Sequence, residues 1–267
     1  MIPAKRPNSA LLKLKSGEMV RLFVLGNFAS PRHVDFVCQS QQFDALWFDL
    51  EHFDIPTQDL AVLNLVARAY DVSTIARFKA TDYQGVMRVL ETGVGGIMCS
   101  MVNDASEARQ IVQWAKFHNP SPEPGEVSGA RGWNGGNVDS AYGNFSATEY
   151  LKHQNAQTMI ICQIELEEAV EQAAAIAAVP GVDGLFFGPG DYSAALGVVG
   201  QLSHPRVIAA TEKVAKAAKD AGKWWGTVAV GQEMCARVKA QGAQLICPGG
   251  DVRIMNLGMR ELVKTFG

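Results

Sequence analysis

The chain has 267 residues, of which 48% are hydrophobic and 19% are charged, and its formal net charge is -3. This balance excludes a disordered chain, and the weak net charge argues against a nucleic-acid or membrane-surface partner. The five cysteines form no CxxC pair, and no apolar run approaches the ~20 residues of a membrane helix. We therefore predict one soluble, cytoplasmic domain over residues 1–267. We interpret the basic residues near its N-terminus as a solvated arm.

Short apolar runs typical of strands alternate with helical patterns along the chain. The predicted strands are Val20–Gly26, Ala45–Asp49, Val72–Phe78, Val94–Ser100, Thr158–Glu165, Val182–Phe187, Trp224–Val228 and Ala243–Cys247. The predicted helices include Asp82–Glu91, Ala105–Phe117, Glu168–Ala178, Arg206–Ala221, Gln232–Gln241 and Arg253–Phe266. Eight such units in this length favour an α/β fold closed into a (β/α)8 TIM-type barrel. The rival, an open doubly wound sheet, would be favoured by a GxGxxG turn after the first strand, which is missing.

Residues 118–150 interrupt this rhythm with a stretch rich in Gly, Pro, Ser and Asn. Irregular segments this long inside a compact domain are usually functional or mobile. Because the segment joins the fourth unit to the fifth, we expect a long irregular loop over the active-site rim of the barrel.

Active sites of such barrels gather at the C-terminal ends of the strands. The fifth strand ends in Gln163 and Glu165, which share one face because strand side chains alternate. The sixth strand leads through Gly188-Pro189-Gly190 to Asp191. Two carboxylates on neighbouring strands suit Mg²⁺ or Mn²⁺ better than zinc. The alternative for Asp191 is a cap on the helix that follows.

The second strand ends in Asp49-Leu50-Glu51-His52, and the third ends in Arg77-Phe78. Asp49 could orient His52, which could move a proton near neutral pH. Arg77 could neutralise a carboxylate or a developing enolate oxygen. The alternatives are a locally packed His52 and a structural ion pair of Arg77 with Asp49 or Glu51.

Together these strand ends resemble the HpcH/HpaI family of class II pyruvate aldolases. The matching stretches are Phe48-Asp49-Leu50-Glu51-His52, Ala76-Arg77-Phe78, Leu90-Glu91-Thr92-Gly93, Gln163-Ile164-Glu165, Gly181-Val182-Asp183-Gly184 and Gly188-Pro189-Gly190-Asp191-Tyr192-Ser193. The similarity covers nearly the whole chain from about Leu22 onward.

The resemblance implies a metal-dependent carbon–carbon lyase that cleaves a 4-hydroxy-2-oxo acid to pyruvate and an aldehyde through a metal-stabilised pyruvate enolate. It implies a divalent ion, Mg²⁺ or Mn²⁺ with Co²⁺ as an alternative, on Glu165 and Asp191. It further implies enolate stabilisation by Arg77, pyruvate binding by Gln163, carboxylate binding by the backbone NH groups of Gly190 and Asp191, and proton transfer by His52 braced by Asp49.

The same resemblance implies a homo-oligomer, a hexamer built as a trimer of dimers that exchange their last helices, here Arg253–Phe266. It also implies that Glu91 reaches a histidine of a neighbouring subunit. No Schiff-base lysine is needed, so Lys79 is interpreted as a solvated residue of the rim.

The sequence departs from the family pattern at Gly190 and Tyr192, at Trp133, Asn134 and Asn137 in the long loop, and at Asn27 after the first strand. We expect these residues to line the acceptor side of the pocket, so they bear on the aldehyde rather than on pyruvate. Two other functions stay open. One is a related metal–enolate enzyme, such as an oxaloacetate decarboxylase or a citramalyl/malyl-type lyase. The other is a barrel that binds a keto acid without turning it over.

Overall fold

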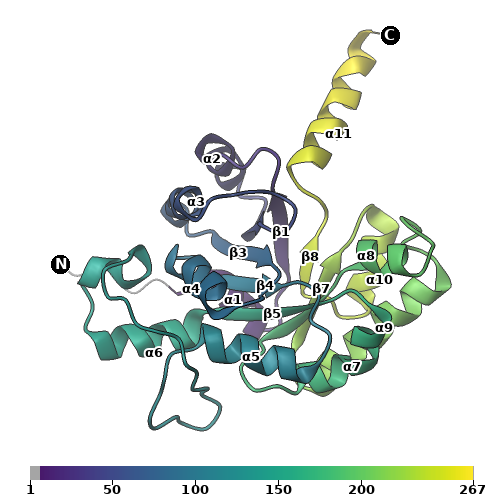
Figure 1. Ribbon diagram of the computed structural model, residues 1–267. Coiled ribbons are helices and arrows are strands. Elements are labelled where there is room, and N and C mark those ends of the chain that lie inside the picture. The colour runs from purple at the N-terminus through teal and green to yellow at the C-terminus, as the bar shows by residue number, and fades with distance from the viewer. Residues whose placement is uncertain (1–6, 267) are drawn as a thin grey trace.

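The computed structural model describes residues 7–266 and shows a closed barrel of eight parallel strands (Figure 1). The strands are β1 Val20–Leu25, β2 Ala45–Asp49, β3 Ser73–Phe78, β4 Gly96–Cys99, β5 Met159–Ile164, β6 Gly184–Phe187, β7 Trp224–Val228 and β8 Leu245–Cys247. Each strand pairs with the next, and β8 closes the ring on β1. The predicted TIM-type barrel is confirmed, with every predicted strand present and most of them shorter by one to three residues.

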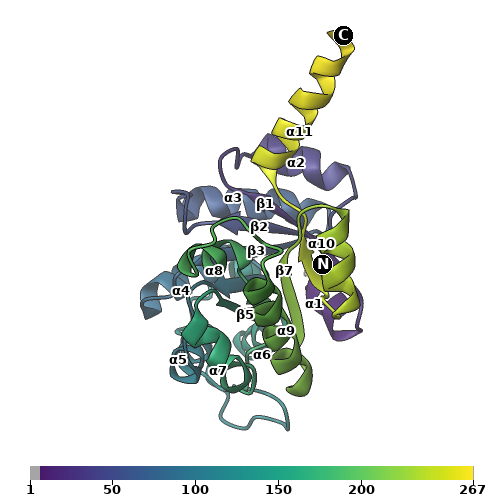
Figure 2. The same cartoon turned by 90° about the vertical axis from the view of Figure 1, so that its right-hand side faces the viewer.

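Helices surround the strands on the outside of the ring (Figure 2). They are α1 Ser9–Lys15, α2 Pro31–Gln39, α3 Thr57–Ala69, α4 Tyr83–Glu91, α5 Ala105–Ala115, α6 Ala147–Gln157, α7 Glu167–Ala177, α8 Pro189–Ala195, α9 Pro205–Asp220, α10 Gln232–Ala240 and α11 Asp251–Val263. Two short 3-10 helices, η1 Val138–Gly143 and η2 Lys264–Phe266, complete the set. Among the described residues, no helix has the length and apolar character needed to cross a membrane.

The hydrophobic core forms two layers because the strands are buried on both faces, as parallel strands are. Inward side chains such as Trp47, Ile75 and Met98 fill the barrel, while outward side chains such as Ile97 and Phe187 pack against the helices. This alternation continues to the strand ends and decides which polar side chains face the interior there.

Helix α1 closes the N-terminal end of the barrel. Its apolar residues Ala10, Leu11 and Leu14 are buried in the same cluster as the inward strand residues. Lys13 pairs with Asp44 at 2.6 Å. The interpretation of this region as a solvated arm is therefore wrong for α1, whose apolar stripe was too short to be recognised beside its lysines.

The long segment between α5 and β5 lies differently from the expectation. Asn137, just before η1, donates to Glu91 at the end of α4, and η1 and α6 flank the starts of β3, β4 and β5. In Figure 1 the segment and α6 lie on the side of the barrel away from α8. This part of the segment thus lies at the N-terminal end and does not cover the rim. The reason is topological, because a chain leaving a helix of a βα unit returns to the strand starts.

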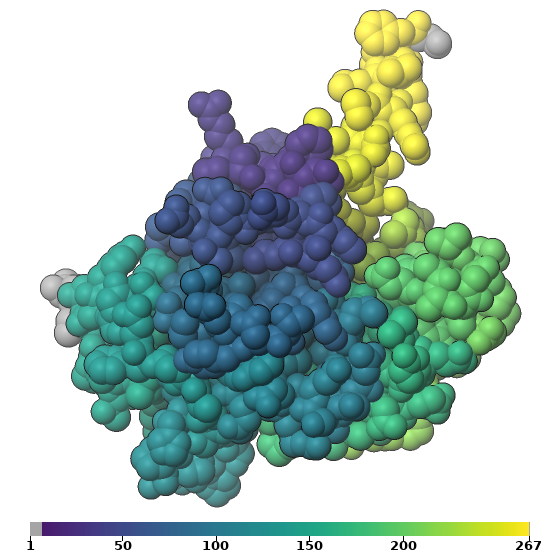
Figure 3. All heavy atoms as spheres, in the orientation of Figure 1, coloured from purple at the N-terminus to yellow at the C-terminus, as the bar shows by residue number. Residues whose placement is uncertain are grey.

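Helix α11 projects from the body of the barrel, as Figures 1 and 3 show. Its first residue, Asp251, is buried and accepts hydrogen bonds from the backbone NH groups of Gly26 and Phe28, both at 2.9 Å. Beyond that anchor the helix exposes a series of apolar side chains: Val252, Ile254, Met255, Leu257, Met259, Leu262 and Val263. Such a run of apolar surface on an isolated helix is typical of an interaction surface.

Candidate active site at the C-terminal end of the barrel

Arg77 is fixed inside the mouth of the barrel by two acidic residues of the neighbouring strand and loop. The strand register places it beside Asp49. Its Nε donates to Asp49 Oδ1 at 2.9 Å, its Nη2 donates to Asp49 Oδ2 at 2.6 Å, and its Nη1 lies 2.7 Å from Glu51 Oε2. The guanidinium also lies 4.9 Å from the ring centre of Trp47. The ion pair that was the alternative for Arg77 is therefore present, and it orients a buried cation within the barrel mouth.

Glu165 is a buried carboxylate that has no cationic partner among the described residues. It is 1% exposed and forms no ion pair within residues 7–266. It accepts a hydrogen bond from the backbone NH of Met101 at 3.0 Å and another from the Gln163 side-chain amide. Burial raises the pKa of Glu165 to about 7; the Met101 hydrogen bond and the charge of Arg77 lower this pKa, whereas the charges of Asp191 and Glu51 raise it.

The backbone around Glu165 is shaped to admit this carboxylate. Met101 has a φ of 55°, a left-handed conformation that a non-glycine residue adopts rarely, and this directs its NH toward Glu165. At Gly188 a Cβ atom would lie 2.6 Å from Glu165 Oε1. Only glycine therefore fits between the end of β6 and the carboxylate.

Asp191 follows directly on this turn. Helix α8 begins at Pro189 with Gly188 as its N-cap, so Asp191 is in the first turn and is not the cap that the alternative reading required. Its side chain is exposed toward solvent. The charge of Asp191 contributes to the raised pKa of Glu165, which indicates that the two carboxylates face a shared region.

These residues form a suitable donor set for a hard divalent cation. No cluster of three or more His, Cys, Asp or Glu side chains occurs within the part of the chain that the structure describes. A site made of two carboxylates with water completing the shell needs no third such residue, and Mg²⁺ is typically bound in this way. The side-chain amide of Gln163 orients the Glu165 carboxylate by donating a hydrogen bond to it. The residues present therefore fit a metal ion.

His52 lies at the edge of this region. Its side chain is exposed, and its ring forms no hydrogen bond with any residue that the structure describes. Asp49 instead accepts from the backbone NH groups of Glu51 and His52 and bonds through both oxygens to Arg77. The expectation that Asp49 braces the imidazole of His52 is thus wrong in this chain, because Arg77 competes for the carboxylate.

A cavity of about 620 Å³ opens beside this cluster. It is lined by Asp49 and Arg77 from the strands, by Asn27 after β1, and by residues of α11 such as Arg253 and Arg260. Asn27, which was expected on the acceptor side, is among the residues that line this cavity. Lys79 is exposed, and its Nζ donates to the carbonyl of Met101 at 2.5 Å, as suits a residue of the rim.

The loop residues expected on the acceptor side lie elsewhere. Trp133 is 58% exposed, and Asn137 donates to Glu91 Oε2 at 2.8 Å. The nearby Arg131 is buried on Asp139 and on the Phe117 ring. The expectation that these residues line this chain's own pocket is wrong, since the segment packs on α4 and α5.

The structure adds several residues to the site that sequence reasoning did not select. Met101 and Gly188 shape the position of Glu165, Trp47 lies under Arg77, and Asp251 holds the loop after β1. The left-handed conformation of Met101 leaves no signal in the sequence. The inward position of Trp47, two residues before Asp49, could have been found from strand alternation.

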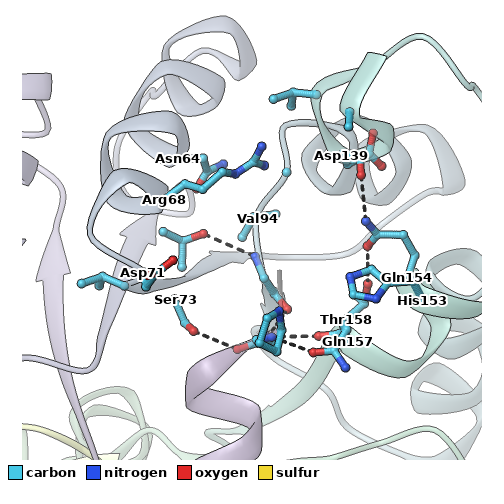
Figure 4. Close-up of a pocket in the computed structure, with 18 of the residues that line it drawn as sticks. Asn64, Arg68, Asp71, Ser73, Val94, Asp139, His153, Gln154, Gln157 and Thr158 are labelled. Carbon is cyan, nitrogen blue, oxygen red and sulfur yellow. Dashed lines mark hydrogen bonds between the residues drawn. The ribbon is translucent and has the colours of Figure 1, made fainter. Parts of the chain in front are cut away.

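A second hollow, of about 190 Å³, lies at the opposite end of the barrel (Figure 4). Arg68, Asp139 and His153 come to it from α3, η1 and α6. Its floor is formed by the strand starts near Ser73 and Thr158. The N-terminal face of a TIM barrel usually contributes to stability and not to catalysis. The candidate active site is therefore the cluster at the other end.

The chain is similar to several known proteins. A hydroxypyruvate/pyruvate aldolase of Pseudomonas aeruginosa is 29% identical over 254 residues, covering 95% of this chain and 91% of that protein. A 4-hydroxy-2-oxo-heptane-1,7-dioate aldolase of Shigella sonnei is 29% identical over 229 residues, covering 84% of this chain and 82% of that protein. The crystal structure of an HpcH/HpaI aldolase/citrate lyase family protein from Burkholderia cenocepacia superimposes with a TM-score of 0.88 at 29% identity, covering 97% of this chain and 99% of the other.

The family model described as HpcH/HpaI aldolase/citrate lyase matches residues 21–256, a range that contains the barrel strands except the first residue of β1, and the whole cluster around Glu165 and Arg77. The chain belongs to the HpcH/HpaI aldolase/citrate lyase family.

Proposed function

We propose that this aldolase cleaves a 4-hydroxy-2-oxo acid to pyruvate and an aldehyde, using Mg²⁺ or Mn²⁺ held by Glu165 and Asp191. The observation that carries the proposal is the state of Glu165. It is buried, its pKa is raised to about 7, and it has no cationic partner among residues 7–266. A carboxylate held at this cost is explained by a cation that binds there.

The residues of the chain then take distinct roles. Arg77, oriented by Asp49 and Glu51, directs its remaining N–H donors toward the keto oxygen, where negative charge develops during cleavage. A divalent cation, when bound, supplies a Lewis acid for the same charge. The backbone NH groups of Gly190 and Asp191, in the first turn of α8, bind the carboxylate of the keto acid.

His52 removes the proton from the 4-hydroxyl group as the carbon–carbon bond breaks. Its exposed ring can meet this group from the edge of the mouth. Imidazole titrates near neutral pH and suits a group that takes and returns one proton per turnover. Asp49 supports His52 indirectly, by accepting the backbone NH of the segment that carries it.

The apolar surface of α11 supports assembly into a homo-oligomer. Ile254, Leu257 and Leu262 are 45%, 50% and 67% exposed on a helix that projects from the body. We extend the proposal to a hexamer in which paired subunits exchange α11, and to a neighbour's histidine as a partner of Glu91. The free cysteines of the described chain fit the proposed cytoplasmic location.

Exchange of the pyruvate methyl protons tests the proposal. The protein with pyruvate and Mg²⁺ or Mn²⁺ in D₂O should incorporate deuterium at the methyl group, as measured by proton NMR. Glu165→Gln should abolish exchange. Glu168→Gln, which changes an exposed carboxylate three residues further along, should leave it intact.

Exchange no faster than in the metal blank, with the protein folded by circular dichroism, would contradict the proposal. A parallel assay with oxaloacetate distinguishes decarboxylation from aldol cleavage, because only decarboxylation releases CO₂ without an aldehyde.

A further inference from the structure

Ser100 is an inward-facing hydroxyl residue at the mouth of the barrel. It follows β4 directly, two residues after Met98, which fills the barrel interior. Its backbone NH donates to Phe78 O at 3.0 Å on β3, and two residues later the NH of Val102 donates to Gln163 O at 3.2 Å on β5. The strand alternation therefore continues through Ser100, and its side chain is directed into the barrel between the ends of β3 and β5.

Ser100 belongs to the structural setting of Glu165. The residue after it, Met101, has a φ of 55° and donates its backbone NH to Glu165. In the register of β4 and β5, Cys99 pairs with Cys162, so Ser100 and Gln163 are the next neighbours. Ser100 is thus adjacent both to the peptide that holds the buried carboxylate and to the amide that bonds to it.

Two buried polar atoms of this pair have no protein partner. Ser100 is 1% exposed, and its Oγ forms no hydrogen bond with any residue the structure describes. Gln163 is 2% exposed, and its Oε1 is likewise unpartnered within residues 7–266, because its Nε2 donates to Glu165. Buried polar atoms are usually hydrogen-bonded, so each of these needs a partner from outside the chain.

The chemistry of the two atoms defines that partner. Gln163 Oε1 can only accept a hydrogen bond, whereas Ser100 Oγ can both donate and accept. A single hydroxyl group satisfies both, since it donates its proton to Gln163 Oε1 and accepts from Ser100 Oγ. A methyl group in the same place would satisfy neither.

We propose that Ser100 and Gln163 together bind a hydroxyl group on the third carbon of the keto acid, so that the enzyme prefers hydroxypyruvate to pyruvate as its keto acid fragment. The inference rests on the proposed function. The keto oxygen is bound on the β3 side by Arg77 and the carboxylate on the β6 side by Gly190. The 4-hydroxyl group is on the side of His52, which follows β2. The third carbon therefore lies nearest to the ends of β4 and β5.

Binding of the two keto acids tests the inference without requiring turnover. We would titrate the Mg²⁺-loaded protein with hydroxypyruvate and with pyruvate by isothermal titration calorimetry and take the ratio of the two Kd values. The unchanged chain should bind hydroxypyruvate about tenfold more tightly, the difference expected for one well-placed hydrogen-bonding group. Ser100→Ala should bring the two Kd values together by weakening hydroxypyruvate alone.

Three further variants control the experiment. Ser100→Thr keeps the hydroxyl and should retain the preference. Ser100→Cys, nearly equal in size, should lose it even if the alanine variant is unstable. Thr211→Val removes a buried hydroxyl from α9, where it donates to Val207 O, and should change neither Kd.

An unchanged ratio of Kd values in Ser100→Ala and Ser100→Cys would overturn the inference while leaving the proposed function intact. Equal loss of both acids would also overturn it, since that result indicates a water molecule that supports the site as a whole. If the unchanged chain bound neither acid, the proposed function would fail with it.

Discussion

Two buried polar clusters, one around Asn8 at the N-terminal end of the barrel and one around Glu165 at the C-terminal end, differ in how far their hydrogen bonds are satisfied. At the N-terminal end the Asn8 side chain accepts from Leu11 N and from Ser73 Oγ and donates to the carbonyls of Gly95 and Gln157. Figure 4 labels two of these partners, Ser73 and Gln157. At the C-terminal end Glu165 forms no ion pair with a described residue, and Ser100 Oγ and Gln163 Oε1 have no hydrogen-bond partner among residues 7–266.

This contrast separates structure from function. A buried network that satisfies its own hydrogen bonds stabilises the fold, whereas one that leaves acceptors open retains a cost that a ligand can remove. The same division is known for TIM barrels in general, with stability at the strand starts and chemistry at the strand ends. Variants at either end of the barrel test this division between stability and function.

The largest effect is expected at Glu165. Replacing it with Gln removes one of two proposed carboxylates for the cation, so kcat for the aldol reaction should fall by roughly a thousandfold or more. The melting temperature should stay the same or rise, because a costly buried charge is removed. Glu168→Gln is the matched control. A variant that loses stability but keeps activity would reverse the assignment of the two ends.

The next effect concerns pH. The pKa of Glu165 is raised from 4.5 to about 7, so the folded state favours the protonated form. The resulting stability is fully present below pH 4.5 and is lost as pH rises through about 7. For metal-free protein this amounts to about 3 kcal/mol of unfolding free energy.

Urea unfolding in the presence of a chelator at pH 5 and pH 8 measures this loss. The unchanged chain should lose about 3 kcal/mol more than Glu165→Gln between these conditions. Added Mg²⁺ should reduce the difference at pH 8. Identical pH dependence in both proteins would show that Glu165 titrates normally.

A smaller effect, on stability alone, is expected at the other end. Asn8→Ala removes the N-cap of α1 and the hydrogen bonds of its side chain with Ser73, Gly95 and Gln157, so the unfolding free energy should fall by about 2 kcal/mol. Activity per folded molecule should not change. Asn144→Ala, an exposed Asn that bonds only within its own turn, serves as the control. A loss of kcat in Asn8→Ala would mean that this end takes part in catalysis.

The smallest effect is expected at Gly190. A Cβ there would meet no atom within 4 Å, and the residue lies in the first turn of α8. Gly190→Ala should therefore stabilise the protein by less than about 1 kcal/mol through the lower entropy of the unfolded chain. A rise in KM for pyruvate measured alongside would show that glycine serves the carboxylate site.

Much of the barrel could be predicted because its signals are local. Ala45–Asp49 and Trp224–Val228 are predicted with the correct bounds, and the glycines at 222 and 242 follow their helices with φ of 67° and 87°. Helices α1, α2, α3, α6 and α8 escaped the prediction. In α1 a short apolar stripe lies among lysines, and in α8 seven residues are too few to show a period.

The candidate site divides in the same way. Alternation along β5 correctly placed Gln163 and Glu165 on one face, and both are buried at the strand end. The competition between Arg77 and His52 for Asp49 could not be predicted, because it depends on the distance between two side chains on neighbouring strands. The position of the segment 118–150 also could not be predicted from its composition, because it depends on the end of the barrel at which the preceding helix, α5, ends.

The sequence by itself determined the barrel, the inward alternation of its strands and the family, because these depend on patterns within each segment. The tertiary structure alone decided which polar atoms find partners, since this depends on atoms that are far apart in the chain. Glu165 next to Met101 and Gly188, and Ser100 next to Gln163, become neighbours only when the ring of strands closes.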